Sequence, residues 1–198
     1  SYIATFLQTA SRTNLVVSDV DFEISAPTKS FFVSGDETLL QSQVLVSRCK
    51  INMTTASAEG TFALRWGVDV MDSTILLSAA QVICASVSFV HVLHFGGKFV
   101  RSHAILEGQS NVSATSTGVP AQVLVQVGTM TNSTWVVQSG SRIFVTSRVL
   151  VIAMSMVNVS DSFIVVRDGC AIEVVAALAS SHASVMTADS VMSNVTVL

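Results

Sequence analysis

Alternation of apolar and polar residues with a period of two is the feature that most constrains this chain. In residues 57–71 one set of alternating positions is apolar: Phe62, Leu64, Trp66, Val68 and Val70. The other set is mixed: Thr61, Ala63, Arg65, Gly67 and Asp69. Successive side chains of a strand point to opposite sides, so we expect Phe62, Leu64 and Trp66 to anchor a core while Arg65 and Asp69 face away from it.

Strand-like segments of this kind cover nearly the whole chain. They are rich in β-branched and aromatic residues, and glycine, proline and aspartate separate them. The pattern predicts eight to ten strands, at 14–24, 43–54, 60–71, 82–95, 98–106, 121–128, 134–138, 142–157, 162–167 and 170–178. Helix is expected only at residues 73–84, where Ser73 could cap a short turn. We find no internal repeat.

Many short alternating strands favour an antiparallel β-sandwich. An immunoglobulin-like domain would be near 100 residues, so a length of 198 residues favours a jelly roll of about eight strands with little helix. We therefore predict a single jelly-roll domain over residues 1–178. Residues 179–198 are small, polar and weakly patterned, and we expect them to form a C-terminal arm or strap.

The chain contains few charged residues. They make up 12% of the sequence, against about 25% in an ordinary soluble domain, while 50% of residues are hydrophobic. Such a surface favours association with other subunits or with lipid, and we assign a subunit interface to Arg65, Asp69, Trp135 and Arg148. Residues 73–97 are long enough to span a bilayer, but their polar residues and the lack of a basic flank argue against a membrane span.

No arrangement of histidines or cysteines predicts a catalytic or metal site. His91 and His94 lie three apart in a strand-like run, which places them on opposite faces. Cys170 could act as a nucleophile only if His103 or His182 lay nearby, which is weak evidence. Cys49, Cys84 and Cys170 form no CxxC motif, so we expect them to be reduced and buried.

Acidic and basic residues also give no site. Asp19 and Asp21 on one strand face, or Asp36 and Glu37 in a turn, could hold calcium or act as acid and base, but solvated surface is the better interpretation. The net charge of −3 and the absence of a basic stripe exclude strong binding of RNA through phosphates alone. Single contacts to RNA remain open at Arg12, Lys29 and Lys50. We expect no enzyme activity, cofactor or small-molecule substrate.

Two short motifs carry a resemblance to a known family. Gly60-Thr61-Phe62-Ala63-Leu64 opens a strand with long alternation, and Thr134-Trp135-Val136-Val137 begins a later one. With its low charge and lack of catalytic motifs, the chain resembles the capsid (coat) proteins of picorna-like plant viruses, the Secoviridae of the Picornavirales, and among them the smallest coat protein of the cheraviruses.

This resemblance implies a structural protein of the virion. It would be one of three related jelly-roll subunits that form a pseudo-T=3 icosahedral shell around positive-sense single-stranded RNA. Its partners would be the other capsid proteins of the same virus, with the enclosed RNA at most weakly contacted. It would be a polyprotein product with Ser1 released by proteolysis, assembled in the host cytoplasm.

A second hypothesis comes from the asparagines. Five of the six lie in N-x-S/T sequons: Asn52, Asn111, Asn132, Asn158 and Asn194. Chance predicts about one or two, so the excess indicates a secreted, glycosylated β-sandwich adhesin or lectin-like binding domain. Asn52 falls within an expected strand, where a glycan requires an outward-facing or edge position.

Overall fold

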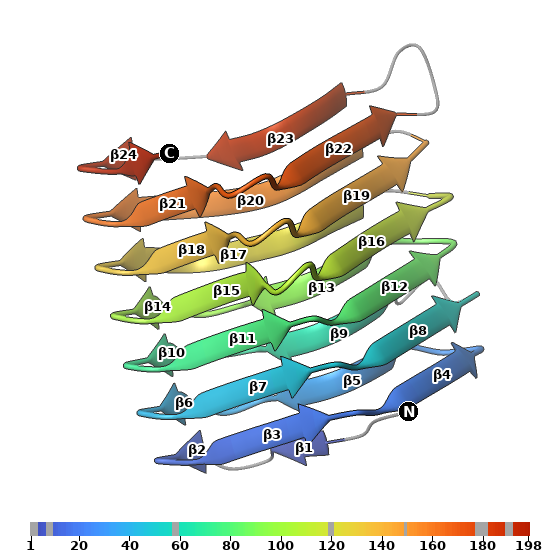
Figure 1. The fold of residues 1–198 in the computed structure, drawn as a ribbon, viewed down its shortest axis with the longest axis horizontal. Coiled ribbons are helices and arrows are strands. Elements are labelled where there is room, and N and C mark those ends of the chain that lie inside the picture. The colour runs from blue at the N-terminus through green and yellow to red at the C-terminus, as the bar shows by residue number, and fades with distance from the viewer. Residues whose placement is uncertain are drawn as a thin grey trace.

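The structure, a computed structural model, describes residues 4–6, 10–56, 60–118, 121–148, 150–176, 182–188 and 192–198. Over these ranges the chain forms strands and no helix, and it winds into a β-solenoid of about six turns (Figure 1). Neighbouring strands are parallel and lie one turn apart along the chain. The prediction of an antiparallel jelly-roll sandwich is therefore wrong, whereas the all-β class is confirmed.

Local alternation could not separate these two folds. Outward and inward side chains alternate along a strand in both. What differs is the pairing partner. In the solenoid, residue Asn14 pairs with Gln43, Gln43 with Thr74, and Thr74 with His103. Equivalent residues in adjacent turns are about 30 residues apart, as shown by the hydrogen bonds that join residues 29 or 31 apart.

Three parallel sheets run along the solenoid. Sheet A contains β1 (Ala4–Phe6), β2 (Ala10–Ser11), β5 (Ser30–Gly35), β6 (Leu39–Leu40), β9 (Thr61–Trp66), β10 (Val70–Met71), β13 (Val90–Phe95), β14 (Phe99–Val100), β17 (Ala121–Thr131), β20 (Leu150–Ser160), β23 (His182–Ala188) and β24 (Met192–Ser193). Sheet B contains β3 (Asn14–Ser18), β7 (Gln43–Ser47), β11 (Thr74–Ser78), β15 (His103–Glu107), β18 (Thr134–Val137), β21 (Phe163–Val166) and β25 (Thr196–Val197). Sheet C contains β4 (Asp21–Ala26), β8 (Lys50–Thr55), β12 (Gln81–Ser86), β16 (Asn111–Ser116), β19 (Arg142–Ser147) and β22 (Ala171–Ala176).

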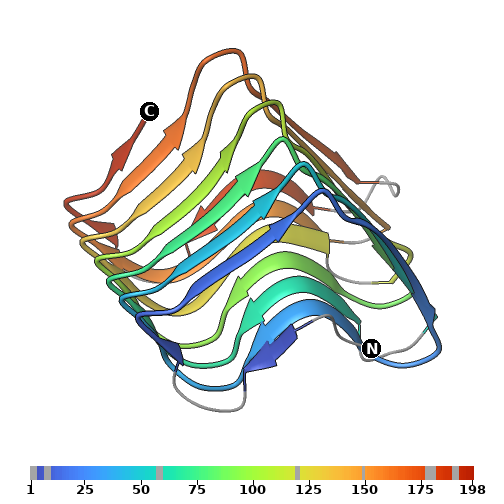
Figure 2. The same ribbon diagram turned by 60° about the horizontal axis from the view of Figure 1, so that its bottom comes forward.

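The three sheets form the sides of a three-cornered tube (Figure 2). Sheet A bows toward the interior, so its outer face is concave, while sheets B and C form the other two sides. Each turn of the chain runs along sheet A, then sheet B, then sheet C, and returns to sheet A. One such turn is called a rung below.

Apolar columns fill the interior of the tube. Each column contains equivalent residues from successive rungs; one column of sheet B consists of Val44, Ile75, Ala104, Trp135 and Ile164, all at most 1% exposed. A column of sheet C consists of Ile51, Val82, Val112 and Ile143, which are equally buried. Leu64 and Trp66 of β9 belong to the same core. Stacking of like side chains thus buries a continuous core that no single rung could form alone.

A serine ladder marks the corner between sheets A and B. In five consecutive rungs the corner contains a buried serine: Ser42, Ser73, Ser102, Ser133 and Ser162. The backbone N–H of each of the first four donates to the Oγ of the next, over 3.0–3.1 Å. The residue before each serine has a positive φ of 47–51°, which turns the chain from one sheet to the next. Backbone groups that the turn removes from the sheets are therefore satisfied inside the protein.

Three further sequence expectations are corrected by these strands. Residues 73–84, expected to be helical, form β11 and most of β12. Residues 14–24, expected as one strand, are β3 and most of β4, separated by a corner at Asp19, whose φ is 58°. In the segment expected as an arm or strap, β23 and β24 pair with β20, and β25 pairs with β21. The described residues of this segment therefore extend sheets A and B of the solenoid.

Residues 73–97, which are long enough to cross a bilayer, contribute β11, β12 and β13. Within the part of the chain that the structure describes, no helix is long and apolar enough to cross a membrane.

Candidate functional site

Aromatic side chains and histidines gather on the concave outer face of sheet A. Two columns of outward-facing residues run along it: Phe31, Phe62 and His91 in one, and Ser34, Arg65 and His94 in the other. Sheet A bows inward (Figure 2), and side chains of the two columns pack against each other, as in the contacts of His94 with Phe62 and His91. Phe31 and Phe62 are therefore only 7% and 5% exposed, although they face away from the core. We call the group of Lys29, Phe31, Phe62, Arg65, Phe89, His91 and His94 the concave cluster.

A break in the alternation produces these columns. Val92 and Leu93 are consecutive in β13, yet both are 0% exposed and both belong to the core. Two inward residues in succession leave His91 and His94 on the same, outward side of the strand. The prediction that these histidines point to opposite faces is therefore wrong.

His91 and His94 form a stacked pair. Their ring centroids are 5.1 Å apart, the ring planes are nearly parallel, with an angle of 4° between them, and the two Nδ1 atoms are 3.0 Å apart. Phe62 meets both rings edge-on, with centroid distances of 5.3 Å. Burial lowers the pKa of His91 to about 3 and that of His94 to about 4, and the charge of Arg65 contributes to the lowering at His94. Both imidazoles are therefore neutral at neutral pH.

Two cations lie over the phenylalanine rings of the concave cluster. Lys29 Nζ is 5.4 Å from the ring centroid of Phe31 and 5.0 Å from that of Phe62. The guanidinium of Arg65 is 5.7 and 6.0 Å from the same two centroids, and it also forms an ion pair with Asp36. Cations in such positions are attracted by the ring faces. They cover the aromatic rings and account for their low exposure.

The chemistry of the concave cluster is that of a packing element. Imidazoles with lowered pKa values are weak bases, and Asp36 at the rim is held by Arg65. Two histidines fall short of the three or four protein ligands of a zinc site. Across the described ranges no group of three or more His, Cys, Asp or Glu side chains could hold a metal ion.

The residues expected at a subunit interface lie in four different environments. Arg65 belongs to the concave cluster, and Asp69, between β9 and β10 of sheet A, accepts the backbone N–H of Lys98 over 2.8 Å. Arg148 is exposed after β19. Trp135 is 0% exposed within the core, so it offers no surface to a partner, and that assignment is corrected. Alternation alone could not decide whether Trp135 points into the core or outward, because its neighbours Thr134 and Val136 also favour strands and give no clear polar side.

Of the three residues expected to anchor the core, two lie in it and one does not. Leu64 and Trp66 are 1% exposed and lie in the core. Phe62 lies outside it, in the concave cluster. Ala63 takes the inward position next to Leu64, as Val92 does next to Leu93.

The remaining nucleophile candidates are not brought together. Cys170 packs against the core at the corner before β22, whereas His103 is exposed on the outer face of sheet B. The side chain of His182 lies outside the described residues. Burial raises the pKa of the Cys84 thiol to about 12, and Cys49 is also buried.

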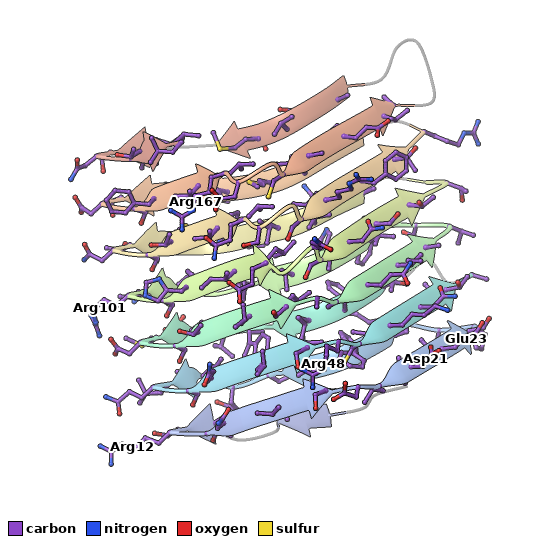
Figure 3. The ribbon with its side chains drawn as sticks, in the orientation of Figure 1. Arg12, Asp21, Glu23, Arg48, Arg101 and Arg167 are labelled. Atoms are coloured by element: carbon purple, nitrogen blue, oxygen red, sulfur yellow. The ribbon has the colours of Figure 1, made fainter. Side chains whose placement is uncertain are left out.

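The charged candidates are dispersed over the solenoid; Arg12 and Asp21, for example, lie on opposite sides of the view in Figure 3. Asp19 forms an ion pair with Arg48 through two contacts of 2.7 Å, while Asp21 is exposed at the start of β4. The hydrogen bond from Arg48 lowers the pKa of Asp19. Asp36 and Glu37 are exposed. The three possible RNA contacts lie apart, Arg12 at the corner between sheets A and B, Lys29 in the concave cluster and Lys50 on sheet C.

All five sequon asparagines lie on the outside of the solenoid. Asn111, Asn132, Asn158 and Asn194 are exposed, and Asn52 is half-buried on the outer face of sheet C. In Asn52-Met53-Thr54 the asparagine and threonine face outward while Met53 is 0% exposed in the core. The N-x-S/T spacing thus coincides with the outward–inward–outward alternation of a strand.

Comparisons with known proteins give no match. No family model matches the chain, and neither a curated protein nor a solved structure is similar to it.

Proposed function

We propose that this chain is an extracellular, N-glycosylated β-solenoid that serves as a binding module. The observation that carries the proposal is the outward placement of all five sequon asparagines. An oligosaccharide needs an asparagine whose side chain reaches solvent, and each of these five meets that condition. The proposal retains the second sequence hypothesis, with a solenoid in place of the sandwich.

The shell-subunit hypothesis depended on a jelly roll. Since the chain is a parallel solenoid, that premise no longer supports it. The solenoid supports a binding role in another way, because three sheets present long, regular outer faces from a stiff core. Regular faces of stacked rungs are the surfaces through which repeat proteins contact partners.

The distribution of the sequons supports separate roles for the faces. Asn52 and Asn111 lie on sheet C, Asn158 on sheet A, and Asn132 and Asn194 at the corner between sheets A and B. The sixth asparagine, Asn14, is on sheet B and has no sequon. Glycans would therefore cover sheet C and the corner while the centre of sheet B stays uncovered.

The proposal is tested by the mass of the chain after secretion from a eukaryotic cell line, with and without peptide N-glycosidase. We expect a mass above 20.9 kDa before enzyme treatment. After treatment the mass should return to about this value, apart from the small change caused by conversion of each glycosylated asparagine to aspartate. Single Asn→Gln variants at the five sequons should each remove one glycan increment where the site is occupied. Asn14→Gln is the matched control and should leave the glycan mass unchanged. A well-folded, secreted chain of unmodified mass would refute the proposal.

A further inference from the structure

The outer face of sheet B has an aliphatic stripe along its centre. The stripe contains one residue from each of six successive rungs: Val16, Leu45, Leu76, Ile105, Val136 and Val165. Val16 is 51% exposed, and the other five are half-buried by their neighbours in the stripe. Neither the concave cluster nor the sequons account for this surface.

Stacking within the solenoid does not by itself require an aliphatic column. The central outward column of sheet C occupies the equivalent place on the adjacent side, and it is mixed: Glu23, Asn52, Ile83, Ser113, Phe144 and Glu173. That column stacks with the same parallel register. The continuous aliphatic character of sheet B is therefore a property of its outer surface, and contiguous apolar surface of this kind marks an interaction site.

We propose that sheet B is a self-association surface, on which a second copy of this chain packs face to face to form a two-fold symmetric dimer. The face is about 17 Å wide and about 29 Å long, from about five residue positions per rung and six strands. This corresponds to about 500 Å² on each copy, or about 1,000 Å² in the pair, which reaches the lower limit for a specific interface. The dimer is therefore expected to be reversible rather than obligate.

The columns beside the stripe are complementary under one arrangement of the two copies. A two-fold axis parallel to the solenoid axis sets the stripe of one copy on the stripe of the other. Outward-facing residues two positions before each stripe residue form the preceding column, and those two positions after it form the following column. The same axis places each residue of the preceding column opposite the following-column residue of the same rung in the other copy, four positions later in the sequence. His103 then faces Glu107, and Phe163, which is 51% exposed, faces Arg167. Each contact occurs twice, and a cation over an aromatic ring is favourable.

The polar groups of the following column are held in place before association. Gln138 Nε2 donates to Glu107 Oε2 over 2.9 Å, and Gln138 Oε1 accepts from Arg167 Nη2 over 2.7 Å. Glu107, Gln138 and Arg167 thus form a chain of hydrogen bonds along the edge of the stripe. Figure 3 labels Arg167 at this edge. Side chains ordered in the monomer lose less entropy on association.

The test measures the mass of the chain in solution by sedimentation at increasing concentration. We expect a monomer–dimer equilibrium that Ile105→Lys shifts toward monomer, with at least a tenfold increase in Kd. Ile83→Lys, an equally half-buried isoleucine on the outer face of sheet C, is the matched control and should leave the Kd unchanged. Thermal unfolding of both variants at low concentration verifies that they remain folded.

A charge exchange tests the orientation of the two copies. Glu107→Lys should weaken the dimer, because it removes the carboxylate that would accept from His103 of the other copy. The double variant His103→Glu/Glu107→Lys again sets a carboxylate opposite a donor and should restore the Kd to within about threefold of the wild type. Failure of this rescue would overturn the proposed axis.

Three results would overturn the proposal as a whole. The first is a monomer at concentrations up to about 1 mM. The second is a dimer with the same Kd in Ile105→Lys. The third is a monomer that floats with phosphatidylcholine vesicles, which would assign the stripe to a lipid surface instead.

Discussion

The backbone N–H of Ser73 donates a hydrogen bond to the side-chain oxygen of Ser102, 3.1 Å away in the next rung of the solenoid. The same Oγ lies 2.8 Å from the carbonyl oxygen of Val100 and 3.3 Å from that of Val70. One buried hydroxyl therefore connects two rungs at a place where the chain turns and leaves its sheet hydrogen bonds. The serine ladder supplies these connections where sheet pairing cannot.

Substitution of Ser102 by alanine should destabilise the protein. The change removes one acceptor and leaves the buried N–H of Ser73 without a partner, which costs about 1–3 kcal/mol. Ser25→Ala on the exposed outer face of sheet C, outside any sequon, is the control, and we expect a change within about 0.5 kcal/mol. The measurement is the urea midpoint of each variant. Equal midpoints for Ser102→Ala and the wild type would show that the ladder adds nothing to stability.

Gly35 should not tolerate alanine. A Cβ at this position would lie 2.7 Å from Nε1 and 2.8 Å from Cδ1 of Trp66, a side chain that is 1% exposed and cannot move aside. Overpacking of this kind costs about 1–3 kcal/mol, measurable as a lower thermal midpoint. Gly67→Ala is the control, because a Cβ there meets the mobile end of Arg65 at 2.9 Å. A loss for Gly67→Ala as large as that for Gly35→Ala would argue against the packing of Trp66 described here.

The concave cluster should make stability depend on pH. His91 and His94 titrate near pH 3 and 4 in the folded chain and near 6.5 when unfolded, so the unfolded state binds more protons between these values. Stability is fully present at pH 7, and we expect it to fall as the pH is lowered from about 6.5 to about 4. The hydrogen bonds from Arg48 and Arg101 lower the pKa values of Asp19 and Asp72, which shifts the titration of these carboxyl groups away from the window of the histidines.

The matched variant for this pH dependence is His91→Phe/His94→Val. These side chains continue the columns of Phe62 and of Val125, and they carry no proton in the window. Chemical denaturation across the pH range should give a flatter stability profile for the double variant. An unchanged slope between pH 6.5 and 4 would mean that the two histidines are not the groups responsible.

The sequence predicted the strands better than their partners. Alternation correctly placed Leu64 and Trp66 in the core and Arg65 outside it. It gave no information on whether β9 pairs with a hairpin neighbour or with β5 and β13 a full turn away, because side-chain direction is the same in both cases. The solenoid follows from pairing over about 30 residues, which local patterns do not report.

The sequence contains one signal of the repeat, and the expectation of no internal repeat is wrong. A polar or charged residue followed by serine recurs at Gln41-Ser42, Asp72-Ser73, Arg101-Ser102, Asn132-Ser133 and Asp161-Ser162. The corner requires a residue with positive φ followed by a small buried hydroxyl, so residue type repeats at these positions. It also repeats at the end of the sheet C strands, where Thr55, Ser86, Ser116 and Ser147 are equivalent and buried. At most other positions only the direction of the side chain, inward or outward, repeats from rung to rung. Residues as different as Ala104 and Trp135 therefore occupy the same inward column.

The concave cluster could not be predicted from alternation. It depends on two successive inward residues in sheet A, Ala63-Leu64 in β9 and Val92-Leu93 in β13, and on the inward bow of that sheet. By contrast, the sequons were correctly identified from sequence, and only their outward placement required the structure.

Removal of one complete rung tests the solenoid most directly. Deletion of residues 73–101 joins Asp72 to Ser102, which is equivalent to Ser73, so the corner keeps a positive-φ residue followed by serine and each remaining rung can stack on its new neighbour. Because contacts in a solenoid extend only to adjacent rungs, we expect the shortened chain to unfold cooperatively, with its strand content per residue retained by circular dichroism. Deletion of residues 73–86 removes only the sheet B and sheet C strands of that rung, β11 and β12, and leaves its sheet A strands without them. This deletion should abolish folding. A folded half-rung deletion beside an unfolded full-rung deletion would contradict the account.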